Sequence, residues 1–143
     1  MAKLILNNNT SKSMQEHALA TFPEECCGFM FGSYKDDMVV VDSVRIVKNS
    51  HPDFRSRRFI ISPEDYSNAE EYADENSLAL VGVYHSHPNH PALPSETDRL
   101  AAMPGFTYII YSIMDGEPSD VSAWELEDDR SKFSAVEIVN TKE

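Results

Sequence analysis

An uninterrupted apolar segment near the middle of the chain places the strongest constraint on how it can fold. Residues 78–84 read Leu-Ala-Leu-Val-Gly-Val-Tyr, without the alternation of polar and apolar side chains found in half-exposed strands. Such a run is typical of a central β-strand that is covered on both faces. His85 and His87 follow it directly. Because side chains alternate along a strand, the two imidazoles are expected to project from the same face at the strand's end.

Two carboxylates elsewhere in the chain complete a pattern typical of a hydrolytic metal site. Asp98 stands eleven residues after His87, and Glu25 stands sixty residues before His85. Imidazole nitrogens and a carboxylate oxygen suit Zn²⁺, and three protein ligands leave one coordination position open for water, as in catalytic zinc sites. A further carboxylate, that of Glu25, is then available to carry protons. The pattern predicts a zinc hydrolase.

The third ligand has alternatives within the same segment. His90 is a rival donor, but it is flanked by prolines and is expected to lie in a loop. Glu96 is the fallback to Asp98. Residues 95–98, Ser-Glu-Thr-Asp, also resemble a capping box, in which Ser95 caps a helix and Asp98 returns the hydrogen bond. The two roles of Asp98 are compatible, because an acid in the first turn projects out of the helix start.

The spacing of these residues resembles the full motif of the JAMM (MPN+) metalloproteases. The motif residues are Glu25, His85, Ser86, His87, Ser95 and Asp98. Residues 23–28, Pro-Glu-Glu-Cys-Cys-Gly, resemble the family's segment around its catalytic glutamate, and weaker likeness at 58–66 and 103–105 extends the match over roughly residues 11–127. The resemblance implies a cytidine-deaminase-like JAMM/MPN fold in which His85, His87 and Asp98 hold Zn²⁺. It also implies that Glu25 is the general base and then the general acid, and that Ser95 donates to the oxyanion.

The same resemblance implies a metallopeptidase that acts on ubiquitin-like proteins. JAMM enzymes hydrolyse peptide or isopeptide bonds after a C-terminal Gly-Gly, so a ubiquitin-like or sulfur-carrier protein with such a tail is the expected partner. The short chain resembles compact prokaryotic members, and both sulfur-carrier trimming and bacterial ubiquitin-like deconjugation stay open. An exposed strand edge near residues 45–61 is the expected tail-binding site. Arg55, Arg57 and Arg58 either assist docking there or form a solvated face.

Three other functions can be weighed against this one. Cys26 and Cys27 stand beside Glu25, which raises the alternative of a cysteine protease, but they are expected to pack as small apolar side chains. A zinc nucleoside deaminase combines His-x-Glu with Cys-x-x-Cys, and the chain has neither pattern. A non-catalytic MPN scaffold, a pure interaction module, would have lost a motif residue, and none is missing.

Length and composition favour a single domain, residues 1–143, located in the cytoplasm, and the resemblance implies that this domain is a JAMM/MPN+ catalytic domain. The hydrophobic share of 41% is ordinary for a globular protein. The net charge of -12 disfavours binding to nucleic-acid phosphates. The sequence has no run of eighteen apolar residues of the kind that predicts a membrane span, and its first residues do not resemble a signal peptide. The two cysteines are adjacent, which disfavours an ordinary disulfide and fits a reducing compartment.

Periodicity and turn residues predict an α/β fold, a mixed β-sheet flanked by helices. One helix should be capped by Thr10 or Ser11 and end at Pro23, and another should be capped by Ser62 and run to about Glu75. Besides the apolar strand, strands are expected at residues 29–31, 38–47, 59–61, 107–114, 121–126 and 133–139. Residues 48–57 are expected to form a polar loop.

Overall fold

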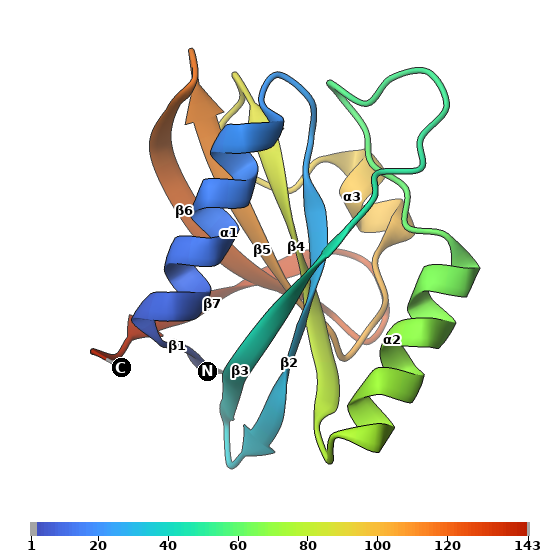
Figure 1. Ribbon diagram of the computed structural model, residues 1–143, viewed down its shortest axis with the longest axis vertical. Helices are drawn as coiled ribbons and strands as arrows, with labels where there is room; N and C mark the ends of the chain where they lie inside the picture. Colours follow the sequence, from blue (N-terminus) through green and yellow to red (C-terminus); the bar gives the residue numbers. More distant parts are fainter. Residues whose placement is uncertain (1–2, 143) are drawn as a thin grey trace.

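The computed structural model describes residues 3–142, which form a small barrel with helices packed around it (Figure 1). The elements follow in the order β1 (Lys3–Leu6), α1 (Asn8–Thr21), β2 (Cys27–Lys35), β3 (Met38–Val47), α2 (Pro63–Glu75), β4 (Ala79–Pro88), α3 (Glu96–Ala101), β5 (Thr107–Met114), β6 (Glu117–Leu126) and β7 (Phe133–Asn140). No helix among these is long and apolar enough to cross a membrane. The predicted α/β architecture with a mixed sheet is confirmed.

The strands pair in the order β1-β3-β2-β4-β5-β6-β7, and β1 also pairs with β7, so the sheet closes on itself. Strand β1 runs parallel to both β3 and β7, and β4 runs parallel to β5. The other neighbours are antiparallel. Closure was not predicted, because it depends on β1, a strand of only four residues whose partners lie far away in the sequence.

Strand β4 is the central strand that the apolar run predicts. It lies between β2 and β5, and its residues from Val81 to Pro88 are buried. Val81 and Tyr84 join the core under α1, which includes Met14 and Ala18. Val83 joins the second core, under α2, which includes Ala69 and Ala73. The strand is therefore covered on both faces, and its end is held rigidly between its neighbours.

Two helix starts can be compared with their predictions. Helix α2 is capped as predicted, since the Ser62 hydroxyl accepts a hydrogen bond from the backbone N–H of Asp65 at 3.1 Å. Helix α1 starts earlier than predicted. Its cap is Asn7, whose side chain accepts from the N–H of Thr10 at 2.8 Å, so the cap is neither Thr10 nor Ser11. Asparagine is as good a cap as serine, and the prediction chose the hydroxyl residues Thr10 and Ser11 instead.

The segment between β3 and α2 differs most from the prediction. Residues 59–61 form no strand, and the whole stretch 48–62 is a loop. Its backbone groups bond within the loop instead of joining the sheet: the N–H of Ser50 donates to the carbonyl of Ile60 at 2.8 Å, and the N–H of Ile60 donates to the Asn49 side chain at 3.1 Å. The expected tail-binding strand edge at 45–61 is therefore a strand only as far as Val47.

Candidate metal centre

The end of β4 and the start of β2 lie side by side and carry the central residues of the site. Cys27 is the register partner of His85, which brings the preceding residue pair, Glu25 and Cys26, next to the histidines. His85 is 1% exposed, His87 7% and Glu25 6%. Three polar side chains buried this deeply need partners, because an unpaired buried polar group is costly.

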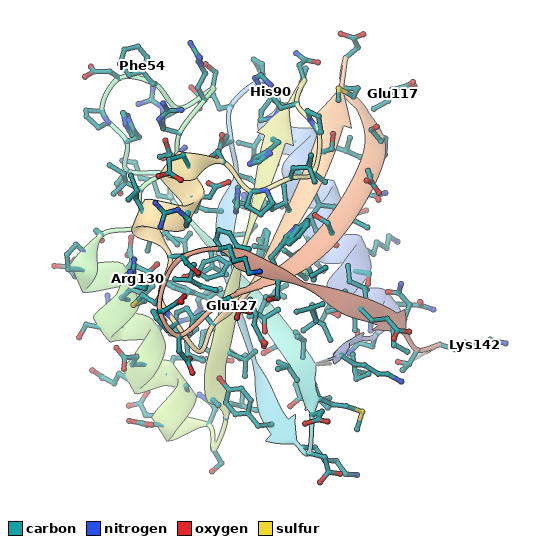
Figure 2. The ribbon with its side chains drawn as sticks, turned by 180° about the vertical axis from the view of Figure 1, so that it is seen from behind. Phe54, His90, Glu117, Glu127, Arg130 and Lys142 are labelled. Carbon is teal, nitrogen blue, oxygen red and sulfur yellow. The ribbon has the colours of Figure 1, made fainter. Side chains whose placement is uncertain are left out.

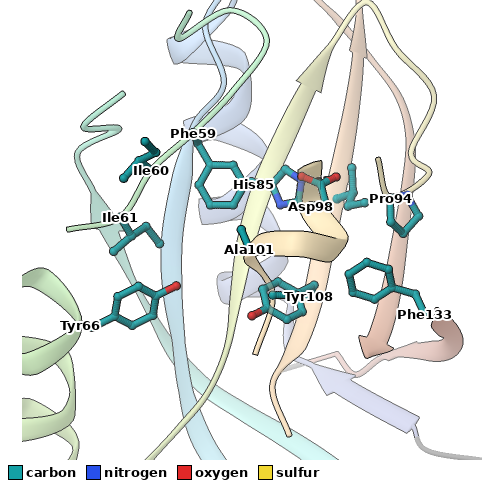
Figure 3. Close-up of a pocket in the computed structure, with 12 residues that line it drawn as sticks. Phe59, Ile60, Ile61, Tyr66, His85, Pro94, Asp98, Ala101, Tyr108 and Phe133 are labelled. Carbon is teal, nitrogen blue, oxygen red and sulfur yellow. Dashed lines mark ion pairs between the residues drawn. The ribbon is translucent and has the colours of Figure 1, made fainter. Parts of the chain in front are cut away.

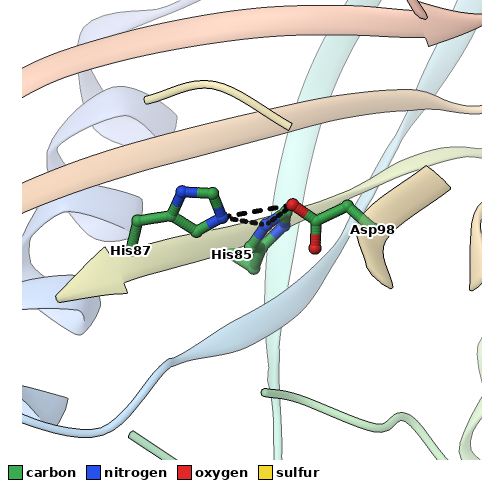
Figure 4. A group of neighbouring side chains, drawn as sticks. All are labelled: His85, His87 and Asp98. Carbon is green, nitrogen blue, oxygen red and sulfur yellow. Dashed lines mark hydrogen bonds and ion pairs between the residues drawn. The ribbon is translucent and has the colours of Figure 1, made fainter. Parts of the chain in front are cut away.

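Three of the predicted residues bring one donor atom each to a common point (Figure 4). The Nε2 atoms of His85 and His87 are 3.2 Å apart. Oδ2 of Asp98 lies 3.5 Å from the His85 nitrogen and 3.2 Å from the His87 nitrogen. Tetrahedral ligands at the usual Zn–N and Zn–O distances of 2.0–2.1 Å stand about 3.3 Å apart. The donor set and its spacing therefore fit a zinc ion.

The ring of each histidine is oriented by a neighbour. Nδ1 of His87 is 2.9 Å from the carbonyl oxygen of Pro91. In the tautomer with its proton on Nδ1, this nitrogen donates to the carbonyl and the lone pair of Nε2 is available to a metal. The His85 ring stacks on Phe59 with centroids 4.5 Å apart, and its buried Nδ1 finds no hydrogen-bond partner in residues 3–142. His87 thus has the hydrogen-bonded support common among metal-binding histidines, whereas His85 is held by packing.

Asp98 occupies both of the roles that the sequence allows it. Ser95 caps α3 and accepts from the backbone N–H of Asp98 at 3.0 Å, while the N–H of Ser95 donates to Oδ2 of Asp98 at 2.9 Å. Burial alone would raise the pKa of Asp98, but the charge of His85 and the hydrogen bonds from the histidines and Ser95 hold it well below its usual range. The carboxylate stays charged and fixed in direction.

The rival ligands lie elsewhere. Among the described residues, the only group of donors close enough to hold a metal consists of His85, His87 and Asp98, so His90 is not part of it. The fallback residue, Glu96, instead forms an ion pair with Arg99 at 2.6 Å, one helical turn along.

Glu25 sits beside this group and is held through its backbone. Its N–H donates to the carbonyl of Arg55 at 2.6 Å, and its carbonyl accepts from Nδ2 of Asn49 at 3.2 Å. Burial raises the pKa of Glu25, and the nearby charges of His85 and His87 oppose that shift. The adjacent Glu24 points outward and pairs with Arg55 at 3.3 Å.

Two positioning residues were missed by the sequence reasoning. Ser86 binds Cys26 twice across the strands: its hydroxyl accepts from the Cys26 N–H at 2.8 Å, and its own N–H donates to the Cys26 carbonyl at 3.2 Å. Asn49 uses its side chain to bind four backbone groups, those of Glu25, His51, Arg58 and Ile60. Ser86 at least belongs to the motif, whereas nothing in the sequence distinguishes Asn49 from other loop asparagines.

The two cysteines pack as predicted, and burial raises the pKa of each thiol to about 12. They stay protonated at neutral pH, which disfavours a thiolate nucleophile. His17 is not part of the donor group. It is half-buried, and its Nδ1 lies 2.7 Å from the hydroxyl of Tyr84.

The donor group separates two cavities of different character. An apolar cavity of about 150 Å³ meets His85 and Asp98 on one side (Figure 3). Its other walls include Phe59, Ile61, Tyr66, Ala101, Tyr108 and Phe133. On the other side, a polar cavity of about 290 Å³ is lined by Glu25, Arg57, Arg58, His87, His90, Pro91, Leu93 and Ser95. Glu25 and Ser95, the two predicted catalytic residues, thus face one shared space.

Comparison with known proteins defines the class. Residues 8–127 match the family described as prokaryotic homologues of the JAB domain. The chain belongs to this family, a compact prokaryotic branch of the JAMM/MPN+ proteins.

Individual members of the family and one solved structure can be compared with this chain. The chain is 34% identical to the desampylase of Pyrococcus furiosus over 115 residues, which cover 80% of this chain and 75% of that protein. It is 38% identical to the deubiquitinase BRCC36 of Xenopus tropicalis over 109 residues, which cover 67% of this chain but only 41% of that longer protein. A solution structure of a protein from Desulfitobacterium hafniense superimposes with a TM-score of 0.84 at 27% identity, covering 98% of this chain and 94% of that one.

Proposed function

We propose that the protein is a zinc-dependent peptidase that cleaves after the C-terminal Gly-Gly of a ubiquitin-like or sulfur-carrier protein. The observation that carries this proposal is the convergence of His85, His87 and Asp98 on one point, with the carboxyl group of Glu25 buried beside them. The relatives named desampylase and deubiquitinase support the substrate class.

Zinc held by these three side chains would supply a Lewis acid and would lower the pKa of water to about 7. Glu25 accepts a proton from the attacking water and passes it to the leaving amine. Burial suits Glu25 to this role, since a raised pKa makes the carboxyl group a stronger base once ionised. The backbone bonds to Arg55 and Asn49 keep it in place.

The Ser95 hydroxyl is proposed to donate a hydrogen bond to the oxygen of the scissile carbonyl. The Oγ atom accepts from the N–H of Asp98 and so keeps its own proton free for donation. The capping role and the catalytic role therefore do not compete. A donor in this position acts mainly in the transition state, when charge develops on the carbonyl oxygen.

The proposal is tested with a Gly-Gly-tailed ubiquitin-like carrier bearing a C-terminal extension, followed by mass spectrometry. Wild-type protein should contain about one zinc per chain and trim the carrier. Glu25→Gln should keep the zinc and lose roughly 10²–10⁴-fold in kcat. His87→Ala should lose most of the zinc, whereas His90→Ala should keep it.

Two outcomes of this experiment would contradict the proposal. Full zinc in His87→Ala would refute the ligand assignment. Stoichiometric zinc in the wild type with no turnover of any Gly-Gly-tailed carrier would favour the alternative, a non-catalytic MPN scaffold.

A further inference from the structure

The polar cavity beside Glu25 is lined by two arginines, Arg57 and Arg58, that form no ion pair within residues 3–142. Arg57 and Arg58 line it from the loop 48–62, and His90 lines it from the segment that follows β4. Phe54 and His90 mark these two segments at the same end of the molecule (Figure 2). The protein as a whole carries a net charge of -12, so two arginines at one cavity stand out.

Neither arginine of the cavity forms an ion pair with a carboxylate among residues 3–142. Within residues 3–142, the ion pairs of arginine are those of Arg55 with Glu24 and of Arg99 with Glu96. Arg58 donates from Nη1 to the backbone carbonyl of Arg57 at 3.0 Å, which leaves further donors of its guanidinium free. Guanidinium groups with free donors match the fork of a carboxylate.

The position of Glu25 determines which part of a substrate enters this cavity. If Glu25 delivers the proton to the leaving nitrogen, the substituents of that nitrogen must lie in the space that Glu25 lines. In an α-amino acid the carboxyl carbon is only about 2.5 Å from the nitrogen, from the standard N–Cα and Cα–C lengths. In a lysine joined through its side chain, the main-chain carboxyl group is far from the reacting nitrogen and is part of a neutral peptide bond.

The size of the cavity points the same way. A volume of about 290 Å³ lies at the lower end of the range for sites that bind small molecules, roughly 300–1,000 Å³. It suits a single amino acid, with Leu93, which is 60% exposed, as an apolar contact for its side chain.

We propose that Arg57 and Arg58 bind the free α-carboxylate of the residue that is released, so that the preferred substrate is a Gly-Gly tail extended by a C-terminal amino acid. This inference rests on the proposed function. In the reaction, the bond between the glycine carbonyl carbon and the amino nitrogen breaks, and a bond to the oxygen of water forms. One proton of water reaches the nitrogen through Glu25, and the products are a glycine carboxylate and a free amino acid.

The test compares three versions of one carrier: a Gly-Gly-Ala tail with a free carboxylate, the same tail with a C-terminal carboxamide, and an isopeptide to the lysine side chain of a second protein. The first two differ by a single charged group. Wild-type kcat/KM should be roughly 10- to 100-fold higher for the carboxylate than for the carboxamide, the usual worth of charge-assisted hydrogen bonds.

Variants then assign the preference to residues. Arg57→Gln and Arg58→Gln should each reduce the ratio between carboxylate and carboxamide, mainly through the carboxylate substrate. Arg55→Gln is the matched control: it removes the same charge from the same loop, but its side chain pairs with Glu24 outside the cavity, so the ratio should persist. Circular dichroism checks that each variant is folded.

The outcomes separate this inference from the function on which it rests. Equal or faster cleavage of the carboxamide and isopeptide substrates overturns the inference and leaves the peptidase intact. A preference that survives in both Arg57→Gln and Arg58→Gln overturns the assignment to these residues. Failure of the zinc-loaded protein to cleave any of the three substrates overturns the proposed function itself.

Discussion

At the scale of single residues, several side chains of the site have both a structural role and a chemical role. Asp98 closes a capping box and turns the same oxygen toward two imidazoles. Ser95 caps α3 through a lone pair and keeps its proton. Such sharing means that a substitution here changes stability and activity at once, so any test must separate the two effects.

Ser95→Ala offers such a test. Loss of the cap should cost about 1 kcal/mol of unfolding free energy, and loss of the proposed oxyanion donor should lower kcat more than it raises KM. Ser62→Ala is the control, because Ser62 caps α2 in the same way but is not part of the donor group. Denaturant unfolding and steady-state kinetics measure both variants. Equal kcat values for the two variants would remove Ser95 from the mechanism.

The cysteines give a prediction that depends on pH. Burial raises the pKa of Cys26 and Cys27 to about 12, so both thiols stay protonated below that pH. A raised pKa means a scarce thiolate, and a thiol-reactive reagent at pH 8 should modify the native protein very slowly. In denaturant both residues should react at once. Rapid native labelling that also stops turnover would revive the thiolate alternative.

At the scale of elements, the loop 48–62 is the part of the site with the least regular structure and the most specific anchoring. Asn49 ties it to the Glu25 backbone on one side and to Arg58, His51 and Ile60 on the other. The loop also brings Phe59 onto the ring of His85. One amide side chain therefore links the proton carrier to the segment that covers a proposed ligand.

Asn49→Ala should release this anchor. We expect zinc content to persist, since the three donor residues lie outside the loop, while kcat falls because Glu25 is less well held. Asn49→Asp separates the two halves of the anchor: it keeps an oxygen for the N–H groups of His51 and Ile60 but loses the donor to Glu25 and Arg58. Zinc analysis, kinetics and thermal unfolding distinguish these effects. Unchanged kcat in both variants would show that Glu25 does not need the anchor.

The sequence predicted the donor group better than its support, for a physical reason. The shared direction of His85 and His87 follows from strand alternation, and the capping box places Asp98 at a helix start, both of which are local rules. The choice of Asp98 over Glu96 as third ligand came from the family resemblance. Asn49 binds Glu25 across 24 residues, and β1 pairs with residues 38–40 of β3 and residues 137–140 of β7. Contacts of that kind depend on the finished fold. The false strand at 59–61 has the same cause, because its backbone bonds are satisfied by a loop.

At the scale of the whole molecule, the donor group lies at the end of β4 and the start of α3, while two separate cores hold the barrel and its helices together. The metal would therefore add to a fold that already has its hydrophobic support. This differs from small zinc modules, whose folding free energy comes from the metal itself.

Chelation should accordingly abolish activity without unfolding the chain. A metal that binds only the native state adds to its stability by mass action, so the chelated protein should unfold cooperatively at a lower Tm and keep its far-ultraviolet circular dichroism. Added Zn²⁺ should restore both Tm and turnover. Loss of secondary structure on chelation at room temperature would contradict this expectation.

The closure of the barrel by β1 has a consequence for how the molecule fluctuates. The seam is short, since β1 has four residues and joins β3 on one side and β7 on the other. Around the ring, two strands separate β1 from β4 in one direction and three in the other. Short peripheral pairings open more often than central ones. Amide protons along the seam should thus exchange with solvent long before those of β2, β4 and β5, and the barrel can breathe at its seam while the strands that carry the histidines stay shut.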